Sequence, residues 1–250
     1  AHSAYWTIDA VPGGVTVTDD SGNGVSGTTN GSPVSVVGVS SAAYTFDNVN
    51  DHFSFTTIII LSDTPCVFEA FVIPSTPTST GHEKRMIVIG EASAPVSDFT
   101  FYQLYVDSFT QQASVFIGSG TTSEVENATG MTLSSGPRLD DGEFHYIAFA
   151  KRGDAGSQIE LYVDDGMVAN GVISGNFAIS ENTNFTAVGA QAADNRFFGD
   201  IDEIGIITSN IPSREEMKER AVRFLARGFS YGMNTTRRMI PTRSGSASVR

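Results

Sequence analysis

A regular alternation of apolar and other residues marks the middle of the chain, between Gln158 and Val163. Ile159, Leu161 and Val163 alternate with Gln158, Glu160 and Tyr162. This period of two is typical of a strand with one buried face. A second strand is predicted from Phe144 to Lys151, and the polar turn from Arg152 to Ser157 joins the two. The pattern therefore predicts a β-hairpin.

Other short apolar segments follow the same logic. Segments from Met86 to Gly90, Phe99 to Val106 and Thr110 to Ile117 predict strands, and the last two form a second hairpin. Loop composition dominates from Gly118 to Gly136. The longest apolar run, Thr57 to Leu61, predicts a buried strand and is far shorter than the ~20 residues that cross a bilayer. Short strands without a helical period predict an all-β fold, an antiparallel two-sheet sandwich.

The pattern changes after Pro212. Ser213-Arg214-Glu215-Glu216 is a capping box, in which Ser213 and Glu216 each bond the backbone N–H of the other. Apolar residues then recur at helical spacing, at Met217, Ala221, Phe224 and Leu225. Gly228 predicts the end of this helix. We expect the apolar face to pack on the sandwich and a basic side to be exposed, formed by Arg214, Lys218, Arg220, Arg223 and Arg227.

Several motifs identify a family resemblance. They are DGEFHYIA from Asp141, LYVD from Leu161, VG from Val188 and FGDIDEI from Phe198. In this order they resemble the laminin-G-like, or concanavalin A-like lectin/glucanase, family. A strand containing Trp6, the segment VTDDSGNG from Val17, YTFDNVND from Tyr44 and CVFEAFV from Cys66 extend the resemblance over Tyr5 to Thr208. It implies a concanavalin A-like jelly roll, a fold that hosts lectins, adhesion modules, hydrolases and virion parts.

Charge divides the chain into two parts. The net charge is −13, but residues 1–212 hold six basic and 25 of the 28 acidic residues, a net −19. Residues 213–250 hold nine basic and three acidic residues, a net +6. An acidic body argues against nucleic acid as a partner, and the basic segment predicts an anionic partner surface, such as another copy of the chain. The first ten residues lack the basic and apolar regions of a secretory signal, so we expect none in this sequence.

Catalysis is not expected. The resemblance implies that hydrolases of this superfamily carry two carboxylates on one strand face, in an E-x-D-x-x-E motif, and the chain has no such run. In the nearest segment, Asp200 and Asp202 share a face of the strand, whereas Glu203 is predicted to point the other way. His145 is expected to have a hydrogen-bonded structural role. Cys66, the only cysteine, is predicted to be packed in a strand and forms no intrachain disulfide.

Loop carboxylates provide candidate calcium ligands. The segment from Asp19 to Gly24 places oxygen ligands at alternate positions beside a glycine turn, like the first half of a calcium loop. The resemblance implies a structural Ca²⁺ at the sandwich edge, for which the candidates are Asp19, Asn23, Asp47, Asp51 and Asp202. The alternative is that these Asp-Gly and Asn-Gly stretches simply form turns.

Glycan binding is a further candidate function, with no position assigned. The family's lectins bind sugars through loop Asp and Asn residues and aromatic platforms. Trp6 is expected to pack in the core, and Tyr102, Tyr105 and Tyr162 are candidate exposed aromatics. Scattered tyrosines on strands are also ordinary, so they do not locate a site.

We therefore predict a jelly-roll sandwich over residues 1–212, a packed helix over residues 213–228 and a basic extended arm over residues 229–250. The arm, with Arg237, Arg238, Arg243 and Arg250, is predicted to bind other protein chains, in a homo-oligomer or in a capsid or tail. The predicted function is a non-enzymatic structural module of an assembly, namely a virion surface component such as a capsid decoration, a spike or a tail-associated protein. Glycan binding for attachment is an additional expected role. The alternatives are a secreted or cell-surface glycan-binding domain and, third, a glycoside hydrolase. No membrane insertion is expected.

Overall fold

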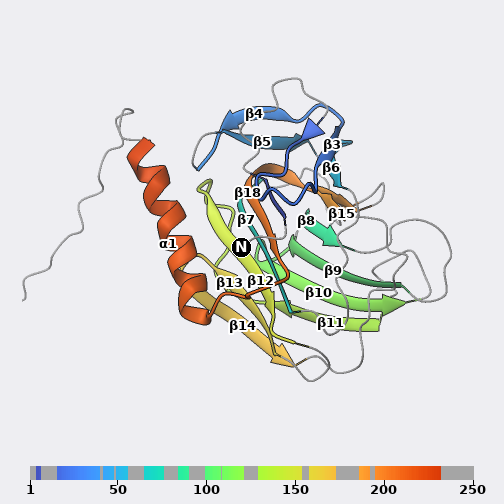
Figure 1. The fold of residues 1–250 in the computed structure, drawn as a ribbon, viewed down its shortest axis with the longest axis vertical. Coiled ribbons are helices and arrows are strands. Elements are labelled where there is room, and N and C mark those ends of the chain that lie inside the picture. The colour runs from blue at the N-terminus through green and yellow to red at the C-terminus, as the bar shows by residue number, and fades with distance from the viewer. Residues whose placement is uncertain are drawn as a thin grey trace, which may run out of the picture.

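The computed structural model describes residues 4–6, 16–39, 42–47, 49–55, 65–75, 84–89, 99–107, 109–120, 129–153, 158–172, 186–191 and 195–231. Their strands form two large antiparallel sheets packed face to face, and the described residues contain one helix, which lies against the first sheet (Figure 1). The predicted antiparallel sandwich with a C-terminal helix is confirmed. No described helix combines the length and apolar character needed to span a membrane.

The first sheet runs in the order β14, β13, β12, β7, β18, β5 and β4, and β1 pairs with the end of β18. The bounds are β14 (Gly166–Val172), β13 (Gln158–Val163), β12 (His145–Lys151), β7 (Cys66–Pro74), β18 (Phe198–Ile207), β5 (Ala42–Asp47), β4 (Val34–Val37) and β1 (Ala4–Trp6). β18, the last of the described strands, thus lies inside this sheet rather than at its edge.

The second sheet runs in the order β11, β10, β9, β8, β15, β6, β3 and β2. The bounds are β11 (Thr129–Ser134), β10 (Ala113–Gly120), β9 (Phe99–Val106), β8 (Lys84–Ile89), β15 (Thr186–Val188), β6 (His52–Phe55), β3 (Gly27–Asn30) and β2 (Thr16–Val17). A separate short pair joins β16 (Ala190–Gln191) to β17 (Asn195–Arg196). The prediction of loop from Gly118 to Gly136 is wrong, because β11 and the end of β10 fall there and Leu133 packs against the core.

The core lies between the inner faces of the two sheets. Ile159, Leu161 and Val163 belong to it, so the inward face of the predicted hairpin strand is confirmed. β12 and β13 pair as expected, with Lys151 opposite Ile159. The rings of Phe68 and Phe149 lie 5.5 Å apart in the same core. Full burial of one such apolar side chain stabilises the fold by roughly 1.5–3 kcal/mol.

Cys66 is fully buried in this core, as predicted. Burial raises the pKa of its thiol to about 12, although the charge of Lys151 acts in the opposite direction. Lys151 lies directly across the β-ladder from Cys66, a neighbour that the sequence order does not show. Because the thiolate is the reactive form, the Cys66 thiol is unreactive at neutral pH.

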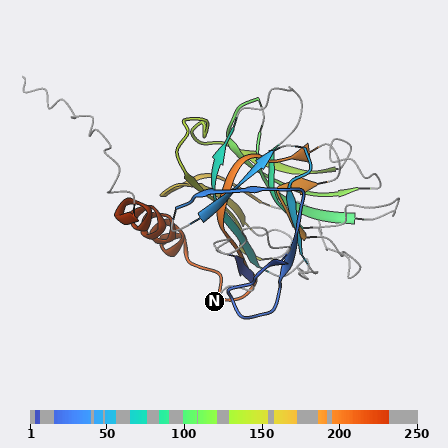
Figure 2. The same ribbon diagram turned by 90° about the horizontal axis from the view of Figure 1, so that it is seen from above.

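Helix α1 (Arg214–Tyr231) covers the outer face of the first sheet (Figure 2). Met217 and Ala221 are fully buried against a second apolar cluster that includes Val67, Tyr146 and Tyr162. The predicted packing of these two helix residues is confirmed. The strand from Gln158 to Val163 is therefore buried on both faces, not on one face as its alternation predicts.

The helix begins as predicted and ends later. The Ser213 N–H donates to Oε2 of Glu216 at 2.7 Å, and the Glu216 N–H donates to Oγ of Ser213 at 3.2 Å, which confirms the capping box. The predicted stop at Gly228 is wrong, because the helix continues to Tyr231. A glycine inside a helix costs only about 1 kcal/mol, so it need not end one.

Some predictions fall on parts of the chain outside the described residues. They concern the run from Thr57 to Leu61, the side chains of Trp6, Tyr102, Phe224 and Leu225, and the arm residues Arg237, Arg238, Arg243 and Arg250. The division of the chain into a sandwich, a helix and an arm stays a prediction, with the helix boundary moved to Tyr231.

Candidate functional site

The outer face of the second sheet carries a continuous row of neutral side chains. Residues directly opposite one another in an antiparallel ladder share a face. The register connects Thr28 to Ser54, passes through β15 and β8 to Gln103, and continues to Phe116 and Thr132. One row of side-chain positions thus crosses the sheet from β3 to β11. We call this surface the second-sheet outer face.

A neighbouring row adds further hydroxyl groups. Tyr105 lies opposite Arg85 on β8 and opposite Ser114 on β10, and Ser114 lies opposite Ser134, two residues along the strands from the first row. The hydroxyl of Ser114 donates to that of Ser134 at 2.8 Å. Their inward neighbours, such as Leu104 and Val115, belong to the core, which places this row on the opposite side.

The centre of this face is enclosed and its β11 margin is open. Gln103 and Ser114 are fully buried, and Tyr105 and Phe116 are nearly so, although all four point away from the core. Thr132 and the hydroxyl-bearing Ser134 are exposed on β11. An amide, several hydroxyls and two aromatic rings therefore meet on one surface.

Carboxylates are missing from the strands of this sheet. None of β2, β3, β6, β8, β9, β10, β11 and β15 contains Asp or Glu. Glycoside hydrolysis needs a pair of carboxylates flanking the scissile bond. These eight strands cannot supply that pair, but their amide, hydroxyl and aromatic groups suit binding of a polar, uncharged ligand.

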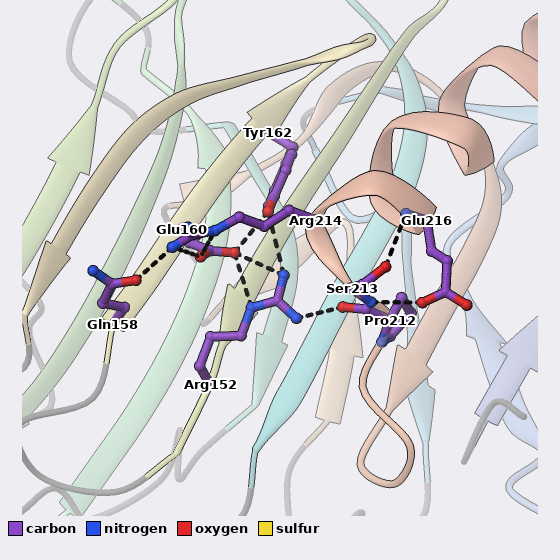
Figure 3. Close-up of polar contacts among 8 residues, drawn as sticks. All are labelled: Arg152, Gln158, Glu160, Tyr162, Pro212, Ser213, Arg214 and Glu216. Atoms are coloured by element: carbon purple, nitrogen blue, oxygen red, sulfur yellow. Dashed lines mark hydrogen bonds and ion pairs between the residues drawn. The ribbon is translucent and has the colours of Figure 1, made fainter.

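The outer face of the first sheet is occupied by helix α1 and two buried carboxylates. Glu160 accepts hydrogen bonds from Nε of Arg152 at 2.9 Å, from Nε of Arg214 at 2.7 Å and from the hydroxyl of Tyr162 at 2.6 Å (Figure 3). Burial raises the pKa of Glu160, but these hydrogen bonds outweigh burial and hold that pKa below its usual value. Arg152 also donates to the carbonyl of Pro212, just before the helix.

The second carboxylate lies further along the helix. Glu69 accepts hydrogen bonds from the hydroxyl of Tyr146 at 2.8 Å and from Nε of Arg220 at 2.9 Å. The prediction that Arg220 decorates the exposed side is thus wrong, because it turns toward the buried Glu69. Arg214 is exposed, as predicted, although its guanidinium reaches the buried Glu160. Arg223 is exposed, as predicted, and pairs with Glu219 on the same helix. These contacts fix the helix in place, and no helix of the described residues lies on the second-sheet outer face.

His145 has the hydrogen-bonded structural role predicted for it. Its Nδ1 lies 3.0 Å from Asp164 and its Nε2 lies 3.0 Å from Asp141. Hydrogen bonds with Asp164 and Asp141 raise the pKa of His145, although burial acts against them. The cluster joins the turn before β12 to the turn after β13.

The predicted calcium ligands mostly bind backbone N–H groups. Asp19 accepts the N–H of Ser21 at 2.9 Å and that of Val25 at 2.9 Å, and the side-chain amide of Asn23 donates to Ser21. Burial raises the pKa of Asp19, but such hydrogen bonds lower it more. This is the geometry of a turn-forming aspartate.

The other three predicted ligands show similar bonds. Asp47 accepts the N–H of Val49 at 2.7 Å, Asp51 accepts that of Ser32 at 2.6 Å, and Asp202 accepts that of Val39 at 2.7 Å. The structure brings Asp47 and Asp51 together, and burial together with Asp47 raises the pKa of Asp51. Within the described residues, no three His, Cys, Asp or Glu side chains gather to hold a metal ion. The five residues do not fit one ion, and calcium binding stays a prediction.

A β-bulge changes the face assignment near the end of β18. The register shifts between Asp202 and Gly205, and Glu203 has a φ of +49°. Ile201 and Ile204 consequently both enter the core, although they are three residues apart. Strict alternation, which predicts Glu203 on the face opposite Asp202, does not hold here. Glu203 instead accepts a hydrogen bond from the hydroxyl of Tyr5 on β1.

Sequence reasoning found some of these residues and missed others. Tyr105 and Tyr162 are buried, so their prediction as exposed aromatics is wrong. The alternation of β9 already places Gln103 and Tyr105 on one face. Ser114, Phe116 and Ser134 were missed, because only the strand register shows that they share it.

A family model described as the concanavalin A-like lectin/glucanase superfamily matches residues 47–215. The chain belongs to this superfamily. No curated protein matches it at a significant level. The predicted family is therefore confirmed, and the match covers most of the sandwich and the start of the helix.

Solved structures of the same fold include three binding domains. One is domain 4 of AbnA, a GH43 extracellular arabinanase from Geobacillus stearothermophilus, solved in complex with arabinotriose. It is 17% identical to this chain, with a TM-score of 0.63, and the match covers 88% of this chain and 98% of that domain. The binding domain of paraclostridial mosquitocidal protein 1 is 8% identical with a TM-score of 0.66, covering 89% and 52%. The CBM40 domain of the Ruminococcus gnavus IT-sialidase, bound to α2,3 sialyllactose, is 14% identical with a TM-score of 0.51, covering 64% and 84%. The superfamily domain thus spans about half the length of the mosquitocidal binding domain.

Proposed function

We propose that this superfamily domain is a non-catalytic carbohydrate-binding module and that the second-sheet outer face binds the sugar. The observation that carries the proposal is the pair of exposed hydroxyl side chains, Thr132 and Ser134, at the open margin of a sheet whose strands contain no carboxylate. The arabinanase domain in complex with arabinotriose, which matches over nearly its whole length, supports it.

The chemistry of the face favours a neutral oligosaccharide. Sugar hydroxyls both donate and accept hydrogen bonds, as do the hydroxyls of the exposed Ser134 and Thr132. The body of the domain is strongly acidic, so long-range repulsion disfavours an anionic glycan.

Binding is tested with a glycan array that contains neutral and sialylated oligosaccharides, followed by calorimetry on any hit. Thr132→Arg and Ser134→Arg place a bulky cation on the open margin of the face, and both should reduce affinity at least about tenfold, or ~1.4 kcal/mol. Ser209→Arg is the matched control, because it adds the same charge at an exposed position near the helix. An array without any binding, or a bound glycan that tolerates both margin variants, would reject this proposal.

The setting of the module belongs to the same proposal. Carbohydrate binding favours an extracellular surface, and the arabinanase whose domain it resembles is extracellular. A virion surface, with the basic arm as an anchor to neighbouring chains, is the second setting and rests on the charge asymmetry alone. Truncation after Tyr231 tests the anchor: the sandwich should stay folded and lose association with its assembly.

A further inference from the structure

Strand β4 forms an edge of the first sheet and is open to solvent. Among the described strands it pairs with β5 alone. Val34 is 62% exposed and Val37 is 85% exposed. Val49 lies in a neighbouring turn and is 68% exposed. Asp51, which follows that turn, accepts a hydrogen bond from the N–H of Ser32, just before β4. Large apolar side chains therefore surround one sheet edge.

This edge lacks several of the features that usually prevent strands from pairing with other chains, although the strand is short, at four residues, and Pro33 precedes it. The missing features are charged side chains, a proline within the strand and a β-bulge. β4 contains none of them, and its register with β5 is continuous. At the opposite edge of the same sheet, the pairing of β13 with β14 is interrupted by a register shift, and Asp164 and Asp165 precede β14.

The charge pattern favours a second copy of this chain as the occupant. Residues 21–46, which contain β3, β4 and most of β5, include no Asp, Glu, Lys, Arg or His, although the chain carries −13 overall. Two such acidic molecules repel each other over most of their surfaces. They can meet at this neutral edge without placing like charges opposite one another.

We propose that two copies of the protein associate by antiparallel pairing of their β4 strands. A two-fold axis perpendicular to the sheet makes this contact self-complementary and joins the two first sheets into one. Pairing satisfies the open backbone groups of both strands and covers Val34 and Val37. Four-residue strands bury less area than a standard interface. The dimer is therefore weak, with a dissociation constant of about 1 μM or higher.

Sedimentation equilibrium of the full chain, from about 1 μM to about 1 mM, tests the association. The expected result is a monomer–dimer equilibrium that Val37→Lys weakens at least tenfold, since a lysine on an edge strand opposes pairing. Val172→Lys is the matched control, because Val172 is 57% exposed on β14 at the other edge, and it should leave the equilibrium unchanged. Thermal melts establish that both variants are folded. A chain that stays monomeric, or a dimer indifferent to Val37→Lys, would overturn the proposal.

Disulfide trapping tests the geometry independently. The two-fold axis of an antiparallel pair passes midway between the two copies of one residue, so that this residue faces its own copy. Among Val34→Cys, Ser35→Cys, Val36→Cys and Val37→Cys, cross-linking should peak at a single position near the middle of the strand. Val172→Cys should not cross-link, and native Cys66 is too buried to interfere. Equal cross-linking at β4 and at Val172, or none along β4, would contradict the pairing.

Discussion

Glu160 offers the sharpest test of how the helix is held. Glu160→Gln keeps the shape of the side chain and removes the charge that faces Arg152 and Arg214. Removing one partner of a buried ion pair costs about 3–5 kcal/mol, because the other charge is left without its counterpart. The Arg214 side chain is 54% exposed and can be hydrated once Glu160 is replaced, so the loss of its ion pair adds little to this cost. We therefore expect the free energy of unfolding to fall by about 3 kcal/mol, from the lower end of that range.

Urea unfolding, followed by circular dichroism, measures this change. The midpoint should fall with the slope m unchanged, and the melting temperature should drop by roughly 6–12 °C for a domain of this size. Glu219→Gln is the control, since Glu219 pairs with Arg223 on the exposed side of the same helix and should give a change near the limit of measurement. A loss below about 1 kcal/mol at Glu160, typical of a surface ion pair, would refute the conclusion that this carboxylate anchors the helix.

Three further predictions concern other parts of the fold. Met217→Ala should lower the free energy of unfolding by about 2–5 kcal/mol in the same assay, because Met217 is fully buried between helix and sheet; a loss under ~1 kcal/mol would contradict that packing. The pKa of His145 is higher in the folded than in the unfolded state. Its contribution to the free energy of unfolding is therefore complete below a pH equal to the ordinary pKa of about 6.5, and it is lost as the pH rises through the folded pKa. The destabilisation by His145→Gln should therefore be larger at about pH 5.5 than at about pH 8.5, and an equal loss at both would contradict it. Because Asp19, Asp51 and Asp202 bond backbone N–H groups, millimolar Ca²⁺ should not raise the melting temperature, whereas an increase would show a calcium site.

Patterns in the sequence predict those elements that depend on residues close together along the chain. The capping box at Ser213 and the hairpin of β12 and β13 depend on residues a few positions apart, and both were found where expected. The helix contacts depend on residues far apart in sequence: Arg214 meets Glu160, and Arg220 meets Glu69, 151 residues away. A single sequence gives no signal for such pairs, so the polarity of these arginines predicts only that they lie on the exposed side of the helix.

The candidate site shows the same limit. Alternation in β9 places Gln103 and Tyr105 on one face, but their neighbours Phe116 and Ser114 come from the ladder register, which the sequence does not reveal. The bulge after Asp202 likewise arises from pairing with β7 and breaks the alternation used for Glu203.

The position of β18 has a consequence for how the protein is made. Its first half hydrogen-bonds to β5 and β7, and its second half to β7 and β1, where Ala4 pairs with Ile206. A nascent chain that has not yet reached Ile207 therefore lacks the strand that joins β5 to β7. Such long-range closure is slow and leaves apolar strand edges exposed until β18 has been synthesised. We expect the ribosome-bound protein to depend on chaperones late, and fragments that end before β18 to aggregate rather than fold.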